Sequence, residues 1–200
     1  TATDVLVLTG VTNLNYLFSS CTSLTTVPSM NSWNMSGVTS LYATFYGASN
    51  FNQNISNWNV SSVTNFGQMF SGATVFNQDI SNWNTSAATY MNGMFYYAAA
   101  FNQDIGDWDV SHVTNMGYLF MGAAAFNQDI SAWNTSANTN LYYAFAHATQ
   151  FNQNIGSWNT SNVTTFNGLF HSATAFNQNI GSWNTTSVTT MNSVFYAATS

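Results

Sequence analysis

Apolar and polar residues recur along this chain with a period of 25 residues. Six successive blocks open with Phe-Asn-Gln-(Asn/Asp)-Ile, carry a Trp at the eighth position and close with an apolar-x-x-apolar-Phe run followed by Ala. They begin at Phe51, Phe76, Phe101, Phe126, Phe151 and Phe176, and none contains an insertion. A fixed period of this length indicates repeats that pack on their neighbours, and it leaves no room for a linker.

Each block contains two kinds of local pattern. Polar and apolar residues alternate with a period of two around Trp58, which predicts a short strand. Phe66, Met69, Phe70 and Ala73 then follow the spacing i, i+3, i+4 and i+7, which predicts one face of a short helix. We therefore expect an α/β solenoid, a right-handed leucine-rich-repeat-type stack of about eight strand–short-helix units with a parallel sheet. The alternative is a β-helix, which the helical spacing disfavours.

The repeat continues towards the N-terminus in degenerate form. Trp33 lies 25 residues before Trp58, which makes 26–50 a degenerate unit. Residues 1–25 form an atypical first unit, in which Leu6 replaces the Trp within a predicted strand, Val5–Leu8. Together with the six regular units of 51–200, these units predict a single domain over 1–200. Neither end shows a polar cap, so we expect either a longer natural chain or copies that join head to tail through their ends.

Charged residues are almost absent. The chain has no Lys or Arg, and charged residues make up 3% of it, all of them Asp. Without cations it lacks the surface that binds nucleic acid or an anionic membrane, so we expect neither partner. No apolar run approaches the roughly 20 residues of a membrane-spanning helix, and no span is expected. A nearly uncharged surface also favours self-association.

Residue types that catalyse reactions or bind metals do not cluster in the sequence. There is no Glu, and the three His, at His112, His147 and His171, occupy different block positions. No motif marks a nucleophile or an oxyanion hole. We expect no catalytic residue, no cofactor and no metal site. Cys21 is the one cysteine, and its apolar-rich surroundings predict a buried small side chain; an intermolecular disulfide is the alternative.

Stacked repeats would turn each outward position into a column of similar residues. The positions that flank the Trp carry mainly Asn and Asp, and both are expected on the exposed side of the sheet. These side chains either solvate the sheet or form a polar face that binds a glycan or a host or matrix protein. The residues of this expected binding face are Asn59, Asn84, Asp107, Asp109, Asn134, Asn159 and Asn184.

A second column consists of Thr alone. It lies just before the predicted helix, so a repeated N-cap is the simpler interpretation and an ice-binding surface is the alternative. Its members are Thr39, Thr64, Thr89, Thr114, Thr139, Thr164 and Thr189.

Asn-x-Ser/Thr acceptors for N-glycosylation are frequent in the repeat. If a glycosylating cell secretes the chain, we expect some of them to carry glycans. The candidates are Asn34, Asn54, Asn59, Asn84, Asn134, Asn159, Asn162 and Asn184.

The block that runs from Phe101 through Trp108 to Met116, and the Leu119-Phe120-x-x-Ala123 run after it, resemble the BspA-like leucine-rich-repeat surface proteins. The resemblance covers nearly the whole chain. It implies a cell-surface or secreted protein, and several family members are linked to adhesion. We therefore expect a non-enzymatic extracellular or cell-surface structural or adhesive protein that self-associates end to end into a fibre or surface assembly. The alternative is a carbohydrate- or protein-binding adhesin module that uses the Asn/Asp-lined sheet face.

Overall fold

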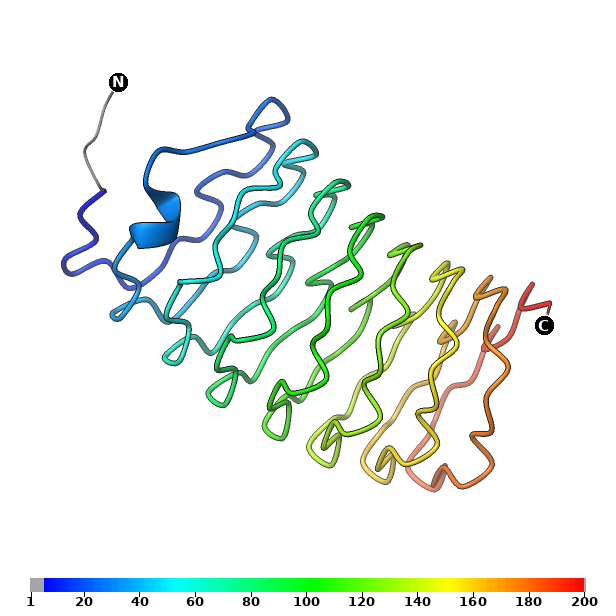
Figure 1. The fold of residues 1–200 in the computed structure, drawn as a ribbon. Coiled ribbons are helices and arrows are strands. Elements are labelled where there is room, and N and C mark those ends of the chain that lie inside the picture. Colours follow the sequence, from blue (N-terminus) through cyan, green and yellow to red (C-terminus); the bar gives the residue numbers. More distant parts are fainter. Residues whose placement is uncertain (1–5, 200) are drawn as a thin grey trace.

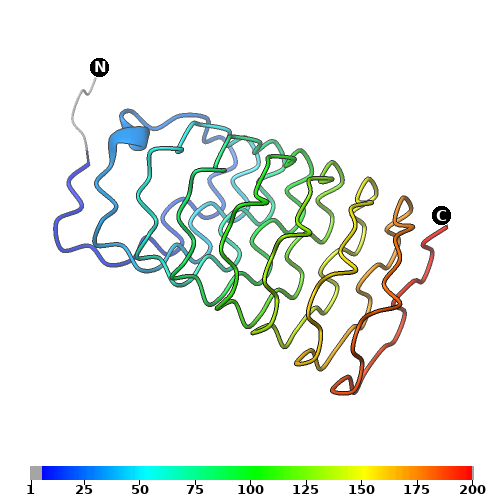
Figure 2. The same cartoon turned by 60° about the horizontal axis from the view of Figure 1, so that its bottom comes forward.

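A computed structural model describes residues 6–199, which form a stack of irregular coils (Figures 1 and 2). The first described coil (blue) and the last one (red) lie at opposite ends of the stack (Figure 1). The one helix of residues 6–199 is a single 3-10 turn, η1 (Met30–Ser32), in the second coil. Parallel bridges of one residue each join successive coils through Asn13, Ser40, Asn65, Tyr90, Asn115, Asn140, Thr165 and Thr190.

The predicted α/β solenoid of strand–short-helix units with a parallel sheet is wrong. Apart from η1, residues 6–199 contain no helix, and their bridges are isolated pairs that do not extend into strands. The β-helix alternative fails for the same reason, because it also requires strands. Backbone bonds from runs of turns, together with side-chain bonds, join the coils in place of a regular sheet.

The segment predicted to be helical is a run of turns. Gln68 has a φ of 53° and Gly72 has a φ of 71°, and the residues at these two places in the block are left-handed in every coil. An α-helix needs right-handed dihedrals at every residue, so two left-handed residues four positions apart stop it from forming here. Most of these left-handed positions are not Gly, so little in the residue types indicated them.

Successive amides in this segment donate alternately within the coil and between coils. The Met69 N–H donates to the Phe66 carbonyl at 3.1 Å, which closes a turn. The Phe70 N–H donates to the Met94 carbonyl of the next coil at 2.9 Å. In a helix both amides would bond within the segment. The inter-coil bonds satisfy backbone groups that the buried position would otherwise leave unpaired.

The segment predicted to be a strand is bounded by turns on both sides. The Trp58 N–H donates to the Ile55 carbonyl at 3.1 Å, and the Val63 N–H donates to the Val60 carbonyl at 2.8 Å. Side chains connect the coils here: the Trp58 Nε1–H donates to the carbonyl of Met30 in the preceding coil at 2.8 Å. The indoles of the later coils repeat this bond with the Ile carbonyl 28 residues earlier.

The Asn of each Phe-Asn-Gln motif also connects two coils. The Asn77 Oδ1 accepts the N–H of Asn102 and the Nε2–H of Gln103, both at 2.9 Å. The same pair of bonds recurs from Asn52 to Asn152 along the stack. This motif is therefore an inter-coil clamp, made of one backbone and one side-chain donor.

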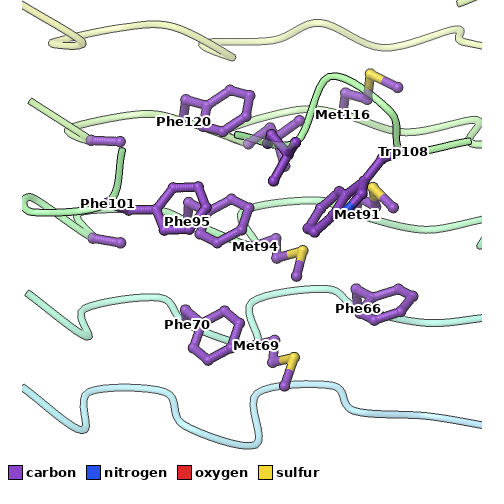
Figure 3. Close-up of a cluster of buried hydrophobic side chains, with 14 of the residues drawn as sticks. Phe66, Met69, Phe70, Met91, Met94, Phe95, Phe101, Trp108, Met116 and Phe120 are labelled. Carbon is purple, nitrogen blue, oxygen red and sulfur yellow. The ribbon is translucent and has the colours of Figure 1, made fainter. Parts of the chain in front are cut away.

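Aromatic rings stacked from coil to coil fill the core. The Phe95 ring lies 5.8 Å from Phe70 and 5.7 Å from Phe120, nearly parallel to both, and 3.9 Å from Phe101 of a second file (Figure 3). All four rings are fully buried. Burial of a side chain of this size contributes about 1.5–3 kcal/mol, so each coil that adds a ring to the file adds about this much to the stability of the stack. In the inner coils the apolar positions predicted from the sequence are thus buried, although the backbone that carries them is not helical.

Neither the strand nor the buried cysteine expected in the first unit is found in the described residues. Val5 of the predicted strand Val5–Leu8 lies outside the described residues, and Leu6, Val7 and Leu8 are not in a strand. Cys21 is exposed, so its prediction as a buried residue is wrong. The division into one domain over 1–200 stays a prediction.

Candidate binding surfaces

The Asn and Asp side chains of the predicted binding face are exposed, but most of them serve the local backbone. The Asp109 Oδ1 accepts the Ser111 N–H at 2.9 Å, and the Asn59 Oδ1 accepts the Ser61 N–H at 3.2 Å. Asn84, Asn134, Asn159 and Asn184 accept the equivalent bond, and Asp107 is also exposed. One side-chain oxygen at each of these Asn positions therefore stabilises a turn.

The same kind of turn lowers the pKa of three carboxyl groups. The Ser81 hydroxyl and then the Ser81 N–H, both hydrogen-bonded to Asp79, hold the pKa of that carboxyl below its ordinary value of 3.8. Asp109 has a lowered pKa for the same reason, through Ser111. In Asp129 the N–H of Ser131 has the larger effect and its hydroxyl the smaller.

The Thr column connects coils and caps no helix. The Thr64 Oγ1–H donates to the Thr39 carbonyl at 3.2 Å, and the Thr64 N–H donates to the same oxygen at 2.9 Å. The Thr residues from Thr39 to Thr189 repeat this pair of bonds. The N-cap interpretation is wrong because no helix follows, and ice binding stays an untested alternative.

The glycosylation candidates are all exposed: Asn34, Asn54, Asn59, Asn84, Asn134, Asn159, Asn162 and Asn184. Exposure is the condition for modification, and their occupancy stays a prediction.

The three His do not assemble with acidic residues. The His112 Nδ1 lies 3.2 Å from the Ser111 Oγ, but Asp109 bonds to Ser111 and does not orient the imidazole. The His147 and His171 rings lie 5.2 Å apart. Within 6–199 no three His, Cys, Asp or Glu side chains gather where a metal ion could bind. The same residues include no helix with the length and apolar character needed to cross a membrane.

Sequence reasoning missed a surface rich in tyrosine. All ten Tyr of the chain, together with His147 and His171, fall in the run of turns that corresponds to residues 65–72 of the third coil. We call the surface formed by these runs the tyrosine face. The ten Tyr are spread over different positions of the run, so no single column revealed them, although their restriction to one third of the block was a usable signal.

Rings of the tyrosine face pack edge to face across coils. The Tyr118 ring lies 6.1 Å from Tyr96 and 5.1 Å from Tyr142, at interplanar angles of 81° and 68°. Partial burial is the largest cause of the raised pKa of Tyr96 and of Tyr118. Their phenols are therefore neutral at physiological pH.

Some of these rings pack directly on the backbone of a glycine in the following coil. A Cβ placed on Gly122 would lie 2.6 Å from the Tyr97 ring, and one placed on Gly168 would overlap the Tyr143 ring. Real Cβ atoms do not approach so closely, so each Gly allows a ring from the coil before it to lie on the backbone. A Tyr followed 25 residues later by a Gly was the sequence signal for this contact.

The tyrosine face contains a hollow of about 300 Å³ that spans four coils. Its lining has no charged side chain and consists of Tyr46, Gln68, Ser71, Asn92, Gly93, Tyr96 and Tyr118. A second hollow, of about 340 Å³, lies at the C-terminal end of the stack and is mainly apolar, with Trp183, Met191 and Phe195 among its lining residues.

These features define a repeat protein of stacked 25-residue coils, one side of which is the tyrosine face. The chain belongs to the family described as "Mycoplasma protein of unknown function, DUF285", which it matches over residues 12–124 and 103–200. Comparison with curated proteins gave no match, and neither did comparison with solved structures.

Proposed function

We propose that this protein is a non-enzymatic structural or adhesive protein of the cell surface or extracellular space, whose copies associate end to end into a fibre or surface assembly. The observation that carries this proposal is the apolar surface of the last coil. Met191 is 52% exposed and Phe195 is 51% exposed, whereas Met116 and Phe120, at the same places in an inner coil, are fully buried at 0%.

A coil stacked on this surface would bury it, and in the proposed assembly that coil is the first coil of a second copy. At the opposite end of the stack, Leu6 and Leu17 are also exposed, at 47% and 42%. The last coil, from residue 176 onwards, contains no charged residue that would oppose contact. Joining these ends would bury both apolar surfaces in the way that inner coils bury each other. Because the two surfaces differ, the contact is heterologous and extends into a fibre.

Backbone donors favour the same arrangement. The Phe170 N–H donates to the Val194 carbonyl of the next coil at 2.8 Å. Phe195 occupies the equivalent place in the last coil, where no further coil follows within residues 6–199 to accept its N–H. A second copy would supply such acceptors together with the apolar contact.

The motif resemblance to BspA-like surface proteins supports a position on or outside the cell. The alternative function, a binding module that uses the Asn/Asp face, has less geometric support, because an oxygen at most of these side chains already accepts a turn N–H.

Charge placed on the end of the stack tests the assembly. Light scattering and electron microscopy of the native chain should show concentration-dependent oligomers or fibres, and the double variant Met191→Asp, Phe195→Asp should be monomeric. Val75→Asp is the matched control, because Val75 is also exposed (41%) but does not belong to the last coil. A native chain that stays monomeric at high concentration, or a double variant that assembles as the control does, would refute the proposal.

A further inference from the structure

The hollow in the tyrosine face exists because small residues interrupt two columns of larger ones. Ser71 lies in register between Tyr46 and Tyr96, one coil away on each side. Gly93 lies in register between Gln68 and Tyr118. A Cβ on Gly93 would lie 3.4 Å from the Gln68 Cγ and 3.7 Å from the Tyr96 Cβ, so it would project into this space. Tyr side chains and small residues thus form the walls and the floor.

Polar groups in the hollow are neutral and incompletely paired. Ser71 is only 3% exposed as a residue, but it lines the hollow, and its hydroxyl oxygen is not among the enclosed side-chain atoms of residues 6–199 that lack a partner, so this oxygen is accessible from the hollow. Within the same residues the side-chain amide of Gln68 has no partner. The Asn92 amide makes one long bond, from its Nδ2 to the Asn115 Oδ1 at 3.4 Å. These polar groups are open to water in the hollow, so a ligand there would replace their bonds to water with hydrogen bonds of its own.

We propose that this hollow binds a neutral carbohydrate chain. A pyranose ring has an apolar C–H face that packs on aromatic rings, whose π faces are electronegative. Its hydroxyls both donate and accept hydrogen bonds, as do the Gln68 and Asn92 amides and the Ser71 hydroxyl. A volume of about 300 Å³ lies at the lower end of the range for ligand sites in proteins. The site is separate from the apolar ends of the stack, so it does not depend on end-to-end assembly.

Charge excludes anionic sugars from the hollow. The whole chain contains no Lys or Arg to pair with a carboxylate or a sulfate, and its net charge is −6. An anionic ligand would lose hydration without gaining a counter-charge. The ligand class is therefore neutral glycans, such as glucans, xylans and chitin fragments.

A proline-rich peptide is the competing occupant, because aromatic grooves also bind such segments. Each proline of such a peptide offers a carbonyl acceptor but no backbone N–H. Wherever prolines face them, the amide oxygens of Gln68 and Asn92 would lose water without gaining a donor. Sugar hydroxyls satisfy both the donors and the acceptors of these amides, so the polar floor favours carbohydrate.

Isothermal titration calorimetry with maltohexaose, cellohexaose, xylohexaose and chitohexaose tests the proposal. At least one should bind the native chain saturably, and Ser71→Tyr should weaken that binding at least about tenfold by filling the hollow. This variant should fold, because Tyr46 and Tyr96 occupy the same register position in the coils on either side. Met121→Tyr is the matched control: it adds a Tyr at that register position in the next coil after Tyr96, outside the lining, and should leave binding unchanged.

Gln68→Ala should weaken binding about fivefold to tenfold by removing one hydrogen-bonding amide. Circular dichroism melts of every variant show whether the stack is intact. The proposal is overturned if no oligosaccharide binds the folded native chain at millimolar concentration. It is also overturned if Ser71→Tyr binds as tightly as the native chain, or if only a proline-rich peptide binds and Ser71→Tyr abolishes that binding.

Discussion

Gly168 gives the sharpest test of how the tyrosine face is built. In Gly168→Ala the new methyl group would overlap the Tyr143 ring, which Tyr118, Tyr142 and His171 contact from its own and neighbouring coils. Gly168 also has a φ of 61°, where an L side chain costs roughly 1–2 kcal/mol. Overpacking adds about 1–3 kcal/mol. We therefore expect Gly168→Ala to lower the free energy of unfolding by about 2–5 kcal/mol.

A double-mutant cycle separates these two costs. Tyr143→Ala removes the ring, so in that background Gly168→Ala should cost only the backbone term of about 1–2 kcal/mol. Ala43, with a φ of 53° at the same place in the second coil, shows that the backbone accepts a methyl group there. Urea unfolding of the native chain, both single variants and the double variant gives the coupling energy. A coupling energy near zero would refute the idea that Gly168 is needed for the Tyr143 ring to pack on the backbone.

Three further predictions concern the bonds between coils and the titratable groups. Trp108→Phe keeps a ring in the stack but removes one of the two donors to the Ile80 carbonyl, which also accepts the Trp83 N–H at 3.2 Å. The lost bond and the smaller ring should together lower the free energy of unfolding in urea by about 1–3 kcal/mol, and no loss would mean that the indole bond is dispensable. The pKa of Asp109 is lowered in the folded state, so its contribution to stability is present above the ordinary pKa of 3.8 and is lost as pH falls through the lower folded value. Asp109→Asn keeps an oxygen acceptor but does not titrate, so stability should depend less on pH in acid unfolding. An unchanged acid unfolding profile would contradict the assignment. The pKa of Tyr96 is raised, so the contribution of this phenol to stability is complete below pH 10.0 and is lost as pH rises towards the higher folded pKa. In thermal melts at increasing alkaline pH, Tyr96→Phe should therefore lose less stability than the native chain. An equal loss of stability in both proteins would contradict this prediction.

The core was largely predictable from the sequence. A repeat without insertions forces equivalent residues to the same depth, so the recurrence of Phe66, Phe70 and Trp58 at fixed places was enough to identify them as buried. The backbone between them was not predictable in the same way. The spacing i, i+3, i+4 and i+7 is typical of a helix, but here successive turns place the same residues inward.

The candidate sites show the same division. The Asn/Asp column around Trp108 is exposed, as the alternation of residues predicted, but its oxygens bond to turn amides that no sequence pattern identified. The tyrosine face was missed because its ten Tyr occupy different positions of the block. The structure brings them together, since a run of turns exposes several positions where a strand would expose every second one.

The sequence by itself determined the period of the stack, the residues of its core and the absence of positive charge, because these depend on composition and spacing alone. Tertiary structure decided the backbone conformation, through a competition between bonds within a coil and bonds to the next coil. Residues such as Gln68 adopt left-handed dihedrals because the neighbouring coil offers carbonyls that repay the local strain, and an isolated block has no such neighbour. The hollow at Ser71 likewise exists only where four stacked coils meet.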